Sequence, residues 1–181
     1  MRYKGVLIIC AGLATMMLIL GCVNPLQEQV NQEIPVSQQV NPEMPALQSW
    51  VNDYANLLSS SSKSMLEARL AQLEKDTTAE VAVATINTIE GKNIDDYATT
   101  LFNKWGLGKK DKNNGVLFLI VLGDRKTRIE VGYGLESVIT NELARIILDE
   151  KVLPQFAVDD YETGILNGVQ AIEELVRKDN Q

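Results

Sequence analysis

The pattern of apolar and polar positions predicts three strands in the middle of the chain. Residues 80–86 and 116–122 are short apolar runs rich in β-branched side chains, which favours strands buried on both faces. Residues 127–131 instead alternate apolar and polar positions, which is typical of a strand with one face in water near a sheet edge. The last two runs are separated by a short turn, so we expect them to pair as an antiparallel hairpin.

Apolar residues at helical spacing predict four helices around these strands. The first helix is expected over residues 65–75. Ser64 precedes it and Glu67 follows Ser64 by three residues, which is the pattern of a capping box at a helix N-terminus. The third helix should end before Pro154, because the residue that precedes a proline disfavours helical geometry. The expected N-cap residues of the four helices are Ser64, Asn93, Thr140 and Asp159.

The order of these elements predicts an α/β fold. A helix joins the first two strands, so they should be parallel and connected by a right-handed crossover. Adding the hairpin gives a small mixed β-sheet with helices on both faces, which is a three-layer αβα sandwich. Residues 50–178 are long enough to form this as one domain with its own core.

The N-terminus has the features of a bacterial lipoprotein signal peptide over residues 1–21. Arg2 and Lys4 precede an apolar stretch that is short for a membrane span, and residues 19–22 resemble a lipobox. Cleavage would leave Cys22 as the first residue, with a lipid on its thiol that anchors the protein in a membrane. An uncleaved N-terminal membrane anchor is the alternative interpretation.

The segment that follows, residues 22–49, predicts a tether between the lipid and the domain. It holds four of the five prolines and many Gln and Asn residues, a composition that cannot bury a core. We therefore expect a membrane-anchored lipoprotein of the cell envelope that faces the periplasm or the exterior. Val23 gives no retention signal of the Asp type, which favours the outer membrane in a cell with two membranes.

Charge and residue usage exclude several classes of function. After residues 1–21 are removed, 15 Lys and Arg face 24 Asp and Glu, a net charge of −9 that would repel nucleic acid. The chain has no histidine, which excludes Ser-His-Asp and Cys-His catalysis and histidine-based zinc sites. Cys10 would leave with the signal peptide and Cys22 would carry the lipid. A metal would therefore be bound through oxygen, which points to a divalent cation such as Ca²⁺ or Mg²⁺.

The glycine-rich end of the hairpin does not predict a phosphate-binding loop. The stretch GVLFLIVLGDRKTRIEVGYGLE, residues 115–136, ends with Gly132 and Gly134 but lacks the third glycine of a dinucleotide fingerprint. It also follows a hairpin strand rather than a strand of a βαβ unit. We expect the hairpin to return this segment beside residues 111–115, at the edge where the central strand begins.

That edge, which we call the loop edge (residues 111–115 and 132–136), gathers candidate ligands for a divalent cation. They are carboxylate and amide side chains, and such oxygens suit Ca²⁺ or Mg²⁺. The alternative is that the asparagines and glycines only form turns and that the glutamate caps a helix. The candidate ligands are Asp111, Asn113, Asn114 and Glu136.

The opposite edge, which we call the turn edge (residues 124 and 159–160), offers a second candidate cation site. Asp124 lies in the hairpin turn, and the last helix begins near Asp160 at the same edge. Open α/β sheets usually bind ligands at the carboxyl ends of their parallel strands, and this is such an edge. The alternative is a hairpin turn and a helix N-cap that need no ligand.

Several segments in order along the chain resemble the TPM-domain family. They are Asn103 to Gly108, Asn113 to Leu117, Arg128 to Glu136, Pro154 with Phe156, and Asp160 with Tyr161. The resemblance covers residues 51–176 and implies an αβα sandwich, divalent-cation binding in some members and acid phosphatase activity in a few. Relatives commonly have Asp-Asn-Gly where this chain has Asn113-Asn114-Gly115, which would leave a less charged site unless Asp111 substitutes.

Two functions follow as hypotheses. The first is a divalent-cation-binding module that contacts or assembles other envelope proteins. The alternative is a metal-assisted phosphatase acting on phosphomonoesters, in which a bound ion polarises a phosphoryl oxygen. The absence of histidine and of any Asp-x-Asp motif favours the first hypothesis.

Overall fold

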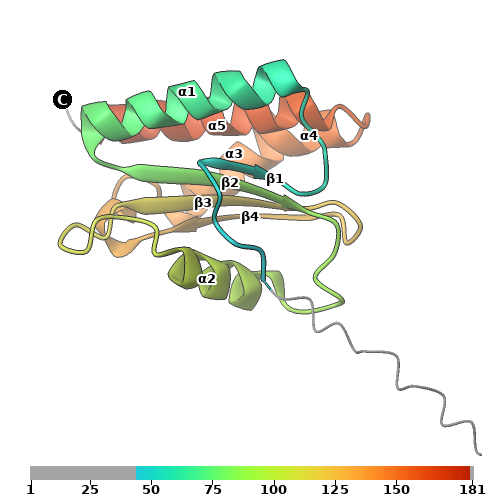
Figure 1. Cartoon of the computed structure of the whole chain (residues 1–181), viewed down its shortest axis with the longest axis horizontal. Coiled ribbons are helices and arrows are strands. Elements are labelled where there is room, and N and C mark those ends of the chain that lie inside the picture. Colours follow the sequence, from blue (N-terminus) through green and yellow to red (C-terminus); the bar gives the residue numbers. More distant parts are fainter. Residues whose placement is uncertain (1–43, 180–181) are drawn as a thin grey trace, which may run out of the picture. The chain divides into compact units, whose positions relative to one another are not determined.

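The computed structural model describes residues 44–179, which form one domain with a four-stranded sheet (Figure 1). The strands are β1 (Val51–Asp53), β2 (Glu80–Ile86), β3 (Gly115–Val121) and β4 (Lys126–Val131). They lie in the order β1-β2-β3-β4; β1, β2 and β3 are parallel, and β4 is antiparallel to β3. The predicted mixed sheet with its terminal hairpin is thereby confirmed.

Helices cover both faces of this sheet. The α-helices are α1 (Ser60–Thr77), α2 (Ile94–Trp105), α3 (Asn141–Ile147), α4 (Leu153–Phe156) and α5 (Tyr161–Asp179). A 3₁₀ turn, η1 (Tyr133–Leu135), follows β4, and a π-helical segment, η2 (Leu148–Val152), joins α3 to α4. Figure 1 shows α1 and α5 above the sheet and α2 below it, so the three-layer αβα sandwich is confirmed.

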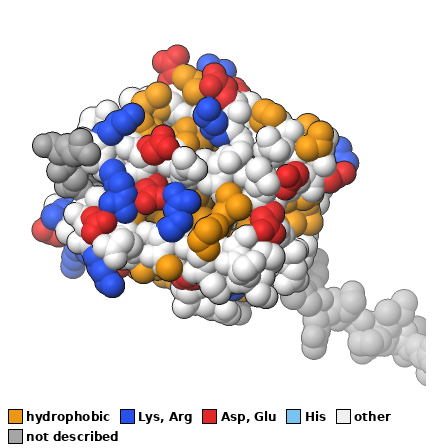
Figure 2. All heavy atoms as spheres, turned by 90° about the horizontal axis from the view of Figure 1, so that it is seen from above, with side chains coloured by type: hydrophobic (Ala, Val, Ile, Leu, Met, Phe, Trp, Pro, Cys, Tyr) orange, Lys and Arg blue, Asp and Glu red, His pale blue; other side chains and the backbone are white. Residues whose placement is uncertain are grey.

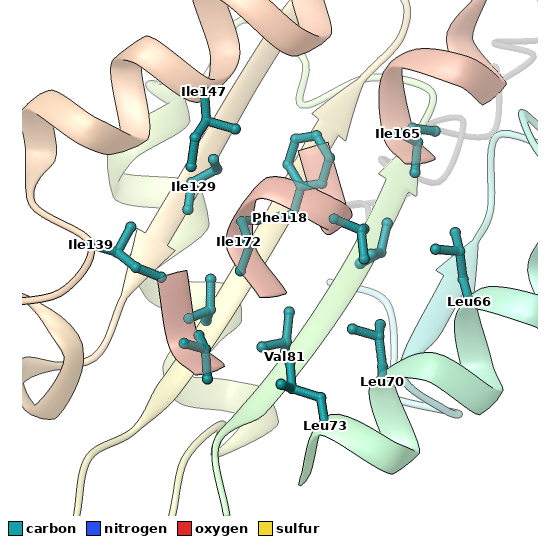
Figure 3. Packing of buried hydrophobic residues seen from close by; sticks show 14 of the residues in the cluster. Leu66, Leu70, Leu73, Val81, Phe118, Ile129, Ile139, Ile147, Ile165 and Ile172 are labelled. Atoms are coloured by element: carbon teal, nitrogen blue, oxygen red, sulfur yellow. The ribbon is translucent and has the colours of Figure 1, made fainter. Parts of the chain in front are cut away.

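Alternation along the central strands divides the core into two layers. Phe118 is fully buried on the face covered by α1, α3 and α5, among the side chains that Figure 3 shows. The neighbouring Leu117 and Leu119 are also fully buried, but they point to the other face, where Leu101 of α2 covers them. Burying a side chain of this size stabilises the fold by roughly 1.5–3 kcal/mol, so both layers contribute to the stability of the sheet.

The first strand was not predicted from the sequence. β1 has only three residues, and a hydrogen bond between the Val83 N–H and the Trp50 carbonyl (2.7 Å) joins it to β2. The Glu67 carboxylate accepts the N–H groups of Trp50 (3.2 Å) and Val51 (2.7 Å). A glutamate of α1 thus holds the start of an edge strand in place.

This role of Glu67 corrects the expected beginning of the first helix. α1 begins at Ser60, and its N-cap is Ser59, whose hydroxyl accepts the Ser62 N–H. Ser64 lies inside the helix and donates back to the Ser60 carbonyl (2.9 Å). The predicted capping box is therefore wrong, because Glu67 serves β1 instead.

The other predicted helix starts are close to those observed. Asn93 and Thr140 cap α2 and α3 as expected. α5 is capped by Asp160, which accepts the Thr163 N–H (3.1 Å), rather than by Asp159. The expected end before Pro154 is wrong, because the chain stays helical from α3 through η2 into α4, and Pro154 is the second residue of α4.

The surface of the α1–α5 layer mixes charges of both signs (Figure 2). Arg69 of α1 pairs with Glu173 of α5 (2.6 Å), and Arg177 of α5 pairs with Asp76 of α1 (2.7 Å). Because these groups are partly exposed, water and salt weaken each pair, and their combined effect is to align the two helices.

The described residues belong to a single compact unit that contains both core layers. Among residues 44–179, the buried hydrophobic side chains of the core all lie between residues 51 and 176. A polypeptide of residues 40–181 therefore keeps the complete core and has what a domain needs to fold by itself. None of the helices within residues 44–179 has the length and apolarity that a bilayer crossing requires.

Candidate functional site

The loop edge is formed where two loops pack against each other at the start of β3. The Gly132 N–H donates to the Gly115 carbonyl (2.9 Å), and the Gly134 N–H donates to the Asn113 carbonyl (3.0 Å). The expectation that the hairpin returns residues 132–136 beside residues 111–115 is therefore confirmed. The two bonds fix the backbone of one loop on the other.

Both glycines are needed for this contact because a side chain would collide with the neighbouring loop. A Cβ atom added to Gly134 would lie 1.9 Å from the Lys112 carbonyl oxygen, and one added to Gly132 would lie 2.3 Å from the Asn113 carbonyl oxygen. Real Cβ atoms essentially never approach backbone this closely. The glycine pair thus serves close loop packing.

Asn114 has a structural role in this edge. Its side chain is buried, its amide oxygen accepts the Lys109 N–H (2.9 Å), and its amide nitrogen donates to the Thr78 hydroxyl (3.1 Å). These bonds close the loop and join it to the end of α1. They support the alternative interpretation of Asn114 as a turn residue.

A lysine and two glutamates, which the sequence did not single out, fix the beginning of the same loop. The Lys109 ammonium donates to Glu74 of α1 (2.7 Å) and to Glu80 of β2. Both hydrogen bonds raise the pKa of Lys109 well above its usual range, and the bond to Glu74 has the larger effect. Glu80 also accepts the Gly108 N–H (2.7 Å), so the loop is held from both sides.

The other three candidate ligands of the loop edge are exposed. The structure records no side-chain hydrogen bond or ion pair for Asp111, Asn113 or Glu136, so their oxygens face solvent. Within residues 44–179, no three acidic, histidine or cysteine side chains come close enough together to hold a metal ion. A cation at this edge would have at most two carboxylate ligands, with the remaining positions filled by amide or backbone oxygens and water.

A pocket of about 340 Å³ adjoins Glu136. Arg128 and Glu130 of β4 line one side, and Thr140 and Asn141 at the start of α3 line the other. Arg128 pairs with Glu130 (3.1 Å) and with Asp95 (3.3 Å), so its charge is largely neutralised. The pocket is polar and open beside one candidate ligand.

At the turn edge, Asp124 and Asp160 already carry structural hydrogen bonds. Asp124 accepts the Thr88 hydroxyl (3.0 Å) and the Ile89 N–H (3.0 Å), which holds the loop after β2. Asp160 caps α5. The two carboxylates bind different segments, and these contacts support their interpretation as turn and cap residues.

Comparison with known proteins agrees with this architecture. A family model described as the TPM domain matches residues 51–175. The solution structure of the N-terminal domain of a protein from P. gingivalis is 32% identical, with a TM-score of 0.68, and the match covers 72% of this chain and 83% of that one.

Two further solved structures share the fold at lower identity. The BA42 protein from Bizionia argentinensis is 20% identical over 67% of this chain and 82% of that one, with a TM-score of 0.58. The N-terminal domain of the cg2496 protein from Corynebacterium glutamicum is 15% identical over 73% and 83%, with a TM-score of 0.56. No curated protein matches the chain. The chain belongs to the TPM-domain family, and residues 51–175 form its TPM domain.

Proposed function

We propose that the TPM domain of this chain is a binding module that holds one divalent cation, Ca²⁺ or Mg²⁺, at the loop edge. The observation that carries the proposal is the glycine-dependent packing of the two loops. It brings Asn113 beside the hairpin return that leads into Glu136, and the side-chain oxygens of Asp111, Asn113 and Glu136 are exposed with no recorded protein partner. Such oxygen atoms are the ligands that both cations prefer.

The composition of the site predicts weak binding. Two carboxylates and one amide supply less charge than sites that bind tightly, and Asn113 stands where relatives commonly have an aspartate. We expect a Kd of about 0.1–1 mM, the range of extracellular calcium modules. That range suits a cation that supports a contact with another envelope protein.

The proposal places this module in the cell envelope. The predicted signal peptide, Cys22 and most of the predicted tether lie outside the described residues. Expressed as the complete chain in cells fed labelled fatty acid, the parent protein should incorporate the label and a Cys22→Ser variant should not. A parent protein that carries no label would instead support the uncleaved N-terminal anchor.

Isothermal titration of residues 40–181 with Ca²⁺ and Mg²⁺ tests the cation site. Glu136→Gln and Asp111→Asn each remove one ligand charge at constant shape, so each should weaken binding by about tenfold. The matched control is Glu150→Gln, which removes one exposed carboxylate for which no partner is recorded and should bind normally. No saturable heat with either cation at millimolar concentration would contradict the proposal.

The alternative, a metal-assisted phosphatase, has one observation in its favour. The pocket of about 340 Å³ beside Glu136 also contains an arginine, and a bound cation there could act on a phosphoryl oxygen. Hydrolysis of p-nitrophenyl phosphate that requires Ca²⁺ or Mg²⁺ and disappears in Glu136→Gln would establish this activity. Hydrolysis that persists in both Glu136→Gln and Asp124→Asn would point to a contaminant or to another site.

A further inference from the structure

A pocket at the turn edge is separate from the proposed cation site. It has a volume of about 390 Å³ and lies between the β3–β4 turn and the segment that joins α4 to α5. Leu153, Phe156 and Ala157 supply apolar surface, and Arg125 and Lys126 supply positive charge. Polar and apolar surface contribute about equally to its walls, and a pocket of this size with both kinds of surface can hold a small molecule that has an apolar part and a charged group.

The aromatic wall of the pocket is held by the fold. The Phe156 ring packs against the Tyr161 ring, with 5.0 Å between ring centroids. A Cβ atom added to Gly164 of α5 would lie 2.5 Å from the Phe156 ring, so the glycine makes room for it. These contacts fix the position of the Phe156 ring, which gives a ligand a preformed apolar surface.

The cations of the pocket have no carboxylate partner. Of the five arginines between residues 44 and 179, four form ion pairs, and Arg125 is the exception. Lys126 has no recorded ion pair either. In a chain with a net charge of −7, two adjacent unpaired cations beside an apolar pocket are charge-complementary to an anion.

One carboxylate limits how much negative charge the pocket can accept. Asp159 lines the wall, and its carboxylate accepts a hydrogen bond from the Tyr161 hydroxyl (3.4 Å). Together with Arg125 and Lys126 it leaves the lining with one net positive charge. A ligand with a single negative charge neutralises that lining, whereas a dianion would be repelled by Asp159.

From these observations we propose that the pocket binds a small monocarboxylate with an apolar body. The carboxylate would pair with Arg125, whose guanidinium can donate two parallel hydrogen bonds, and the apolar body would lie on Leu153 and Phe156. Nothing in this site depends on the cation site, which lies at the opposite edge of the sheet. Either proposal can therefore fail while the other stands.

The probe for this site is 4-phenylbutyrate, titrated into ¹⁵N-labelled residues 40–181. We expect saturable amide shifts at residues 124–127 and 153–161. Arg125→Gln should weaken binding by about tenfold, because it removes a charged hydrogen-bond donor. The matched control is Arg145→Gln, which removes an arginine charge on α3 and should leave the affinity unchanged. Lys126→Gln should also weaken the binding of 4-phenylbutyrate, by a smaller factor than Arg125→Gln.

Two further probes separate the charge from the apolar body. The neutral 4-phenylbutyramide and the dianion phenyl phosphate should both bind more weakly than 4-phenylbutyrate. Equal binding of the amide and the carboxylate would overturn the proposal, because it would show only apolar adsorption. Equal affinities of the Arg125→Gln and Arg145→Gln variants, or the absence of saturable shifts, would overturn it as well.

Discussion

At the scale of single residues, Gly134 illustrates how a glycine can serve packing where its spacing suggests a phosphate. Its sequence context, two glycines two apart after a strand, is shared by loops that bind phosphates. In the structure, the missing side chain lets the Lys112 carbonyl approach the backbone of the hairpin return. The sequence predicted that residues 111–115 lie beside this segment, but only the structure shows how closely the Lys112 carbonyl approaches Gly134.

Gly134→Ala tests this role directly. The new methyl group would overlap the Lys112 carbonyl, and moving backbone apart costs about 1–3 kcal/mol, so the free energy of unfolding should fall by that amount. Chemical denaturation of residues 40–181 measures it. The nearby exposed Ser137→Ala should stay within about 0.5 kcal/mol of the parent protein. Equal stability of the two variants would show that the loops do not pack as described.

Glu162 predicts a pH-dependent contribution to stability. Its carboxylate accepts hydrogen bonds from the Ser62 hydroxyl and from the N–H (2.9 Å) and hydroxyl (2.9 Å) of Ser59, and these bonds lower its pKa below the ordinary value of 4.5. A lowered pKa in the folded state stabilises the protein above pH 4.5, and this stabilisation is lost as the pH falls through the lowered value.

The corresponding experiment compares thermal unfolding of Glu162→Gln with that of Glu150→Gln between pH 7 and pH 3. We expect Glu162→Gln to have the lower Tm at pH 7 and the difference to shrink steadily below pH 4.5. A difference that does not change with pH would mean that the Glu162 hydrogen bonds do not depend on its charge.

At the scale of elements, local signals predicted the central strands and missed the edge strand. β2 and β3 are each seven residues long, and apart from Glu80 and Thr85 of β2 they contain no polar side chain, so their pattern is clear. β1 has three residues, too few for a periodic signal, and exists through its pairing with β2 and the carboxylate of Glu67. Long-range partners of this kind leave no trace in a local pattern.

The start of α1 is a second case in which the tertiary structure decides between local alternatives. Residues 59–62 are all serines and Ser64 follows, so several N-caps are available in the sequence. Ser59 is the observed cap because it also reaches Glu162 of α5, a contact between residues 103 apart. The same applies to two of the candidate cation ligands. The hydrogen bonds of Asn114 with Thr78 and of Asp124 with Ile89 join distant residues and could not be predicted from the local sequence.

Ser59→Ala and Ser64→Ala form a matched pair that tests this assignment. Losing the N-cap should cost about 1 kcal/mol, whereas Ser64 lies inside the helix and its replacement by alanine should be close to neutral. Urea denaturation of both variants measures the difference. A larger loss for Ser64→Ala would restore the capping box predicted from the sequence.

At the scale of the whole molecule, the sheet separates two chemically different edges. The loop edge carries exposed carboxylate and amide oxygens beside closely packed glycines, and the turn edge carries a pocket lined by two cations without ion pairs. The fold class and the closeness of the two loops could be predicted from the sequence because they follow from strand order. The pocket could not, because it depends on how α4 and α5 meet the hairpin turn.

The most direct test of the proposed cation site is a Ca²⁺ titration of ¹⁵N-labelled residues 40–181 followed by amide NMR. The account predicts saturable shifts confined to residues 111–115 and 132–136, with a Kd of about 0.1–1 mM. Saturable shifts at residues 124 and 159–161 instead, or no saturable shift at millimolar Ca²⁺, would contradict it.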